Sequence, residues 1–384
     1  MSGRIAVLVA VTVAAYITTA TLHAQARPAS LDELEARARA DSNDPVSQFE
    51  WAAALARDRR YVVAEGPLRT ALKIDPQYAP ALLLLARVNE SKATGLFAVT
   101  DGRRILFVRS DPRSGETALL RRRAFLIDPL VEVGTPDREL LPRKWRGTLG
   151  KAFRAYEVER WTEAAAGFQE VIDRTVDPSD STDVPAVALW YRARCAIKLN
   201  DFDAAIGYLQ WLHQLRMQDS MTERNWNPFA GEELRYVLAY VHQQAGKLDE
   251  AISRYQELLE QNLGLDGAHT HLAEIYSAQG RWNDAVWERV RAIQSNPDAT
   301  SLYFNLGVTL TAAGRYEEAI ASLRKYLDSY PRDARTYYLM GAGHMNLGRP
   351  ESAQTALKQF LAIAPARYAE QIEDAKRRLG TLGN

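Results

Sequence analysis

The sequence predicts an all-α protein, an α-solenoid in which pairs of helices are stacked in a row. Three observations predict this class. A Gly-Arg pair recurs at Gly280, Gly314 and Gly348, so that successive glycines lie 34 residues apart. Each of these glycines is followed 17 residues later by a proline. Between glycine and proline, apolar residues recur at the three- and four-residue spacing of one helix face, and a period of this length is typical of solenoids.

The segment GRYEEAIASLRKYLDSYP, which begins at Gly314, shows how each repeat is built. We expect Gly314 to end the first helix of the pair, because glycine adopts the left-handed backbone conformation at little cost. Small residues at Gly307 and Ala319 should let the two helices of one pair approach closely. Pro331 lacks an N–H group, and it should therefore prevent the second helix from continuing.

The residues at these positions resemble the signature of the tetratricopeptide repeat, a helix-turn-helix unit of 34 residues. Tyr303, Leu306, Gly307 and Leu310 occupy the aromatic, leucine, small and aromatic positions of that signature. The resemblance implies a right-handed α-solenoid whose inner helices line a concave groove. It also implies a module that holds a protein or peptide partner in that groove.

Stretches further upstream fit the same pattern, and we count about six recognisable repeats. Upstream of the last three repeats, the stretches that fit less closely begin near residues 44, 149, 189 and 236. Gly66 and Pro67 should kink the second helix of the first repeat. The stretch QDSMTERNWNPF, residues 218–229, exceeds one repeat length and should form a loop.

The two ends of the array carry signals of their own. Ser30 and Glu33 have the spacing of a capping box, which predicts a leading helix before the first repeat, and Asp44 is placed to cap the helix that follows. The stretch ARYAEQIEDAKRRL predicts a final helix with a polar face. Such a helix would cover the open end of the stack.

The N-terminus has the order of a secretory signal peptide. Arg4 precedes the apolar stretch IAVLVAVTVAAYI, and Ala24 and Ala26 fit the small residues of a cleavage site. We therefore expect cleavage after Ala26 and an exported protein, periplasmic or secreted. The alternative is an uncleaved segment that anchors the protein in the membrane through residues 5–22. We expect the protein to contact a membrane only in that case.

Residues 91–145 do not fit the repeat pattern. β-branched and aromatic residues stand on both sides of Asp101 and Gly102, a turn signal that predicts a β-hairpin within an otherwise irregular insertion. Two interpretations remain open. The insertion is either an elaborated loop between repeats or a segment that docks the protein onto an envelope assembly as an accessory subunit.

Composition and motifs exclude several classes of function. Lysine plus arginine equal aspartate plus glutamate at 48 each, so no overall positive field favours nucleic acid. The single cysteine, Cys195, can neither form an internal disulfide nor hold a structural metal alone. No nucleophile motif accompanies a general acid and base, and we predict no catalytic residues, no metal site, no cofactor and no enzymatic activity.

The candidate partner-binding residues are those that the repeat alignment places on the groove. Many are aromatic or arginine side chains, which commonly anchor interfaces. Packing between repeats is the alternative role for each of them. The predicted groove residues are Trp190, Arg194, Tyr236, Tyr240, Gln243, Glu274, Phe304, Arg335, Tyr338 and Asn346.

We therefore predict a non-enzymatic interaction module or scaffold in the cell envelope, with an oligomeric state that the sequence does not define. The predicted division of the chain follows its linear order. It comprises a signal peptide (1–26), an N-terminal helix with the first repeat (27–90), the insertion (91–145), the repeat array (146–365) and a C-terminal capping helix (366–384).

Overall fold

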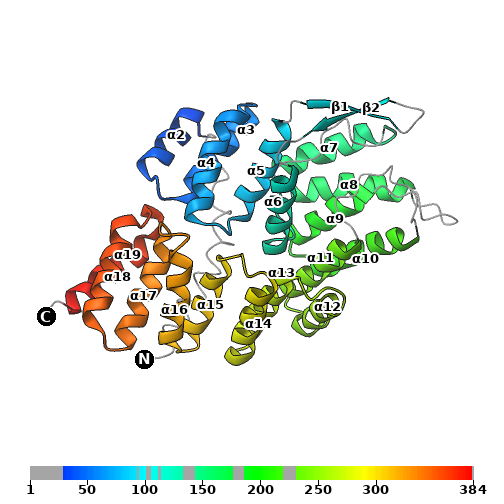
Figure 1. Cartoon of the computed structure of the whole chain (residues 1–384). Coiled ribbons are helices and arrows are strands. Elements are labelled where there is room, and N and C mark those ends of the chain that lie inside the picture. Colours follow the sequence, from blue (N-terminus) through cyan, green and yellow to red (C-terminus); the bar gives the residue numbers. More distant parts are fainter. Residues whose placement is uncertain are drawn as a thin grey trace. The chain divides into compact units, whose positions relative to one another are not determined.

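The computed structural model describes residues 29–92, 95–100, 105–110, 114–132, 143–175, 186–218 and 231–382, and the statements below refer to these residues (Figure 1). The predicted signal segment, the turn at Asp101 and Gly102, and nearly all of the loop expected at 218–229 lie outside them. The chain forms two compact units. Unit 1 combines Met1–Val131 with Tyr276–Asn384, and unit 2 comprises Glu132–Ile275. The predicted linear division of the chain stays a prediction.

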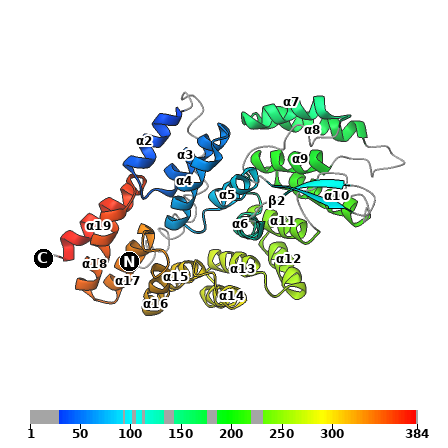
Figure 2. The same cartoon turned by 45° about the horizontal axis from the view of Figure 1, so that its top comes forward.

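Unit 1 joins the two ends of the chain. In both views the N-terminal helices, blue, lie beside the C-terminal helices, orange to red (Figures 1 and 2). The elements of its first part are α2 (Leu31–Ala40), α3 (Pro45–Arg57), α4 (Tyr61–Ile74), α5 (Ala79–Ser91), β1 (Gly95–Thr100), β2 (Ile105–Ser110) and α6 (Ser114–Ile127). Those of its second part are α14 (Trp282–Ser295), α15 (Leu302–Ala312), α16 (Tyr316–Leu327), α17 (Ala334–Asn346), α18 (Pro350–Ile363), the short 3₁₀ helix η3 (Ala366–Tyr368) and α19 (Ala369–Leu382).

Unit 2 consists of helices in its described residues. Its elements are α7 (Arg146–Glu157), α8 (Trp161–Thr175), α9 (Ala186–Lys198), α10 (Phe202–Gln218), α11 (Gly231–Gln244), α12 (Leu248–Gln261) and α13 (Asp266–Ala278), whose last turn crosses into unit 1. Consecutive helices pack as pairs, α7 on α8, α9 on α10 and α11 on α12. The fold is thus the predicted α-solenoid of helix pairs.

The turn between the two helices of a pair is the same in seven repeats. Gly246, Gly280, Gly314 and Gly348 have φ between 66° and 76°, which confirms the role predicted for these glycines. Arg59, Glu159 and Asn200 hold the equivalent positions in three earlier repeats, with φ of 59°. In each turn the N–H of the next residue donates to a carbonyl five residues back, as Arg315 N does to Leu310 O at 2.9 Å.

The close approach of paired helices depends on small residues, as predicted. A Cβ atom added to Gly307 would lie 2.5 Å from Leu323 Cδ2, and one added to Gly341 would lie 2.7 Å from Leu357 Cδ2. Ala319 is 1% exposed and packs with α14 and α15 residues in one hydrophobic cluster. The helix before Pro331 ends early, since α16 stops at Leu327.

The predicted helix starts are confirmed at the N-terminal end. Ser30 and Glu33 form a capping box on α2, and the Asp44 carboxylate accepts from Val46 N and Ser47 N at the start of α3. Helix α4 continues through Pro67. At the other end α19 packs against α18, as the predicted final helix should.

The region predicted as an insertion contains more regular structure than the sequence indicated. β1 and β2 pair antiparallel with Thr100 opposite Ile105, in agreement with the predicted hairpin. The helix that follows, α6, packs against α5, so these two helices form a further pair with the hairpin between them. The repeat pattern missed this pair, because the hairpin replaces the short glycine turn. Among the described helices, none is long and apolar enough to cross a membrane.

Candidate protein-binding surface

The ten predicted groove residues all lie on the first helices of their pairs. Trp190 and Arg194 lie on α9, Tyr236, Tyr240 and Gln243 on α11, Glu274 on α13, Phe304 on α15, and Arg335, Tyr338 and Asn346 on α17. Eight of their side chains belong to three separate clusters, two in unit 2 and one in unit 1, and Tyr338 and Asn346 lie outside these clusters.

The first cluster surrounds Arg194, which is 7% exposed. The Arg194 guanidinium donates through Nη2 to Glu132 Oε2 at 2.5 Å and through Nε to the Tyr156 hydroxyl at 2.9 Å. Its carbon Cζ lies 5.5 Å from the centre of the Trp190 ring. Burial raises the pKa of Tyr156 far above its usual value; the Arg194 charge opposes this shift and the Glu132 charge adds to it. Arg194 and Trp190 therefore have the packing role that the sequence analysis left open.

The second cluster joins α11, α12 and α13. Tyr236 is 1% exposed and packs edge-on against the rings of Tyr255 and His271, at 5.7 and 5.8 Å. Burial raises the pKa of the Tyr236 hydroxyl well above its usual value. Tyr236 is therefore a core residue that supports the surface and does not face solvent itself.

Three partly exposed side chains cover this core. The Tyr240 ring lies 5.2 Å from the His271 ring, with an edge-on geometry. Gln243 donates to the Glu274 carboxylate at 3.3 Å and accepts a hydrogen bond from the Tyr255 hydroxyl at 3.1 Å. The Glu274 side chain is 37% exposed and its Oε2 atom also lies 3.1 Å from His271 Nδ1. We call Tyr240, Gln243 and Glu274 the α11–α13 platform.

The third cluster lies at the start of α17. The Arg335 guanidinium lies over the Phe304 ring, 4.7 Å from its centre. It pairs with Asp333 at 2.7 Å and with Asp75 of the first repeat at 3.1 Å. The Tyr326 hydroxyl donates to Asp333 at 2.8 Å, and its pKa is raised mainly by burial.

Tyr338 and Asn346 have different surroundings on the same helix. The Tyr338 hydroxyl donates to Asp374 of α19 at 2.7 Å, so the final helix covers part of this side chain. Asn346 is exposed, and its amide donates to Ala342 O of its own helix. A partner-binding role for both residues stays a prediction.

Sequence reasoning missed the acidic residues that meet the two arginines. Glu132 and Asp75 come from segments outside the helices they contact. Asp75 follows the second helix of a repeat and Glu132 precedes α7, positions at which the repeat pattern predicts a loop. Predicting these contacts would require information on which distant positions pair with each other. A single sequence does not contain that information.

These features define a class of protein. Paired helices, a left-handed residue at the turn within each pair, and small residues where the paired helices cross are the construction of an α-solenoid repeat protein. Profiles of the tetratricopeptide repeat match residues 149–214, 236–289 and 272–334, and a second profile of the same repeat matches 310–379. Together they cover more than half of the chain, and the chain belongs to the tetratricopeptide repeat family.

Several solved structures match parts of the chain at low sequence identity. A tetratricopeptide repeat protein from Parabacteroides merdae is 12% identical, with a TM-score of 0.45 over 63% of this chain and 100% of that one. MamA is 18% identical, with a TM-score of 0.38 over 46% and 91%. YrrB, described as having an unusual peptide-binding site, is 16% identical, with a TM-score of 0.39 over 55% and 99%. No curated protein sequence matches the chain.

Proposed function

We propose that the protein is a non-enzymatic scaffold of the cell envelope that holds a segment of a partner protein against the inner helices of its repeats. The tetratricopeptide repeat is typically an interaction module without catalysis, which supports the class of function. The signal-like N-terminus supports export. The partner surface that we propose is the α11–α13 platform.

The observation that carries this proposal is the fixed geometry of the platform. Tyr240 rests on the ring of a buried histidine, and Gln243 and Glu274 bond to each other across two helices. Side chains held this way lose little conformational entropy on binding. An aromatic ring beside polar groups is also the composition of interface anchors.

The platform favours a partner segment with hydrogen-bond donors. The Glu274 carboxylate accepts hydrogen bonds and attracts a positive charge, whereas a carboxylate on the partner would be repelled there. The Tyr240 ring offers a face for an apolar or cationic side chain. An extended or helical segment with a basic residue fits these groups.

Affinity capture from an envelope extract tests the proposal. The bait is the chain from Arg27 onward, compared with its Tyr240→Ala and Glu274→Ala variants and with Glu257→Ala, a change on the exposed side of α12. We expect both platform variants to lose the captured partner and the Glu257→Ala variant to retain it. Equal capture by all four proteins would refute the platform.

A second candidate function is docking through the hairpin. β1 and β2 form a two-stranded sheet, and no third strand pairs with it in the described residues. Such a sheet can accept a partner strand at its edge. Replacement of residues 93–113 by a short glycine-serine linker, with α5 and α6 intact, separates the two candidates. Loss of the partner from this variant alone would favour hairpin docking.

A further inference from the structure

The first repeat contacts the last two repeats through side chains and backbone groups at helix ends and on the loops beside them. We call these contacts the clasp. Its N-terminal side consists of Asp41, Ser42, Asn43, Asp44, Asp75 and Gln77, and its C-terminal side of Ser301, Arg332, Arg335, Ile363, Ala366 and Arg367. Both sides belong to unit 1.

Hydrogen bonds in the clasp match donors to specific acceptors. The Asn43 amide donates to Arg332 O at 2.9 Å and to Ile363 O at 2.6 Å, while Arg332 Nε donates back to Asn43 Oδ1 at 3.0 Å. Gln77 donates to Ser301 O at 2.9 Å. The acceptors include backbone carbonyls of two successive repeats. These hydrogen bonds can therefore form together only when the two repeats have the spacing seen here.

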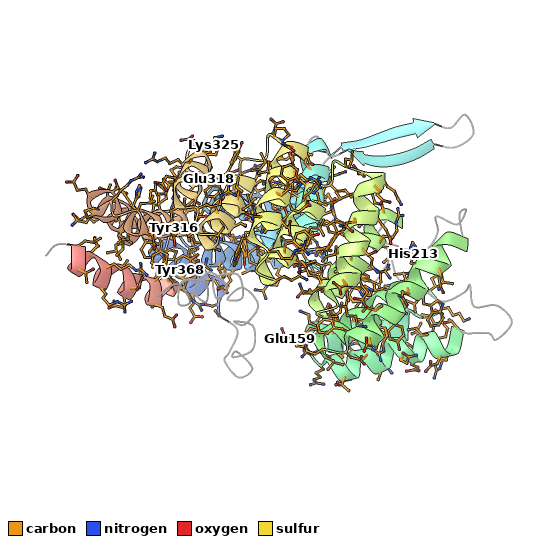
Figure 3. The ribbon with its side chains drawn as sticks, turned by 90° about the horizontal axis from the view of Figure 1, so that it is seen from below. Glu159, His213, Tyr316, Glu318, Lys325 and Tyr368 are labelled. Atoms are coloured by element: carbon orange, nitrogen blue, oxygen red, sulfur yellow. The ribbon has the colours of Figure 1, made fainter. Side chains whose placement is uncertain are left out.

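Two ion pairs complete the clasp. Asp75 meets Arg335 at 3.1 Å, and the exposed fractions of these side chains are 6% and 18%. Arg367 meets Asp44, the cap of α3, at 3.0 Å. Tyr368, labelled in Figure 3, follows Arg367 and lines a narrow crevice with Asp75, Asp333 and Arg335. The first repeat thus covers a predicted groove residue, Arg335.

The clasp can open without leaving Arg335 as an unpaired buried charge. Asp333, the N-cap of α17, accepts from both Nε and Nη2 of Arg335, and the Phe304 ring lies beneath the guanidinium. A buried charge that loses its sole partner is strongly destabilising, but Arg335 would keep Asp333 when Asp75 departs.

The hydrophobic clusters described in the C-terminal repeats use residues of those repeats. The clasp adds hydrogen bonds and ion pairs to a crevice that Pro45 and Ile74 line together with Ala334 and Tyr368. An interface that combines polar and apolar groups in this way resembles the contacts between domains that move relative to each other.

We infer that the clasp is a releasable cover over a second binding surface, centred on Arg335 and Phe304, and that this surface takes an acidic side chain from a partner. Within the chain, the group that occupies this surface is the carboxylate of Asp75. Asp75 follows the end of α4 and stands between Ile74 and Pro76. A partner loop with an aspartate in that setting competes with the first repeat. Competition between a partner loop and the first repeat rests on the proposed scaffold function. The existence of the clasp does not depend on that function.

Cross-linking tests whether the clasp forms within one molecule. Ser42→Cys and Ala366→Cys place two exposed thiols at the clasp and keep the backbone groups that bond there. Burial raises the pKa of Cys195 to about 12, so this native thiol should not react. The control pair is Ser42→Cys with Glu351→Cys, because Glu351 lies at the far end of α18, about 18 Å away along the helix.

With a short bismaleimide, we expect an internal cross-link in the Ser42→Cys/Ala366→Cys chain and none in the control pair. A covalent dimer in place of the internal link, or a yield no higher than that of the control, would overturn the clasp. This result is independent of the α11–α13 platform, so it can fail or succeed whatever the capture experiment gives.

A labelled peptide tests the acidic ligand. The peptide ALKIDPQYAP reproduces residues 71–80, and a matched peptide carries asparagine in place of the aspartate. We expect the full chain with Asp75→Ala to bind the acidic peptide at least tenfold more tightly than the wild type, and an Asp249→Ala control to behave as wild type. Absence of this gain, or equal binding of the asparagine peptide, would refute the acidic specificity.

Discussion

Replacement of Gly307 by alanine tests the account of how the helices of one repeat approach each other. The added Cβ atom would lie 2.5 Å from Leu323 Cδ2 and 2.6 Å from Leu323 Cγ, and Leu323 is fully buried. Because Cγ is not the free end of the side chain, Leu323 cannot turn aside without moving its neighbours. Overpacking of this kind costs about 1 to 3 kcal/mol.

A second glycine isolates that cost. Gly207 lies in α10, and a Cβ atom added there meets no atom within 4 Å. Both substitutions gain the helix propensity of alanine over glycine, about 1 kcal/mol. The difference between the two variants is therefore the packing cost alone.

Urea unfolding followed by circular dichroism measures the difference. We expect Gly207→Ala to raise the unfolding midpoint, and Gly307→Ala to be less stable than Gly207→Ala by about 1 to 3 kcal/mol. The cost should fall in a Leu323→Ala background, where the cavity accommodates the new methyl group. Equal stability of Gly307→Ala and Gly207→Ala would refute the close crossing.

Three further predictions concern the turns, the histidines and a buried ion pair. Glu159, labelled in Figure 3, has the left-handed backbone conformation, which glycine adopts at lower cost. Glu159→Gly should therefore raise the free energy of unfolding by about 1 kcal/mol, and an unchanged urea midpoint would contradict this. Burial, aided by nearby Arg and Lys, lowers the pKa of His242 and His344, so the unfolded chain binds more protons and the melting temperature should fall as pH drops below about 6.5. A His344→Leu variant should show a weaker fall, and an unaltered pH profile would count against it. Glu132→Ala should destabilise unit 2 by about 3 kcal/mol by leaving the buried Arg194 charge without its carboxylate, and the loss of less than 1 kcal/mol in urea unfolding would exclude this.

The local features of the repeats follow directly from the sequence. Gly314 and Gly348 mark turns because the left-handed conformation excludes most other residues, and Gly307 marks a crossing because no larger residue fits. Where the chain tolerates strain, as at Glu159, the glycine signal disappears although the turn remains. Sequence periodicity therefore identifies the later repeats more readily than the earlier ones.

The contacts between distant segments could not be predicted in this way. The pairing of Asp75 with Arg335 joins residues far apart in the chain, and neither residue type nor local spacing specifies it. The burial of Tyr236 depends on rings from α12 and α13 that close over it. The candidate groove residues lie on the first helices of their pairs, but neighbours from other helices decide how exposed each one is.

Site-specific photo-cross-linking in the envelope tests the central claim most directly. A photoreactive amino acid is placed at Gln243 in the α11–α13 platform or, in a second protein, at Phe97 in β1. The account predicts a partner adduct from position 243 and none from position 97. Adducts from position 97 alone would contradict the platform and assign the partner to the hairpin.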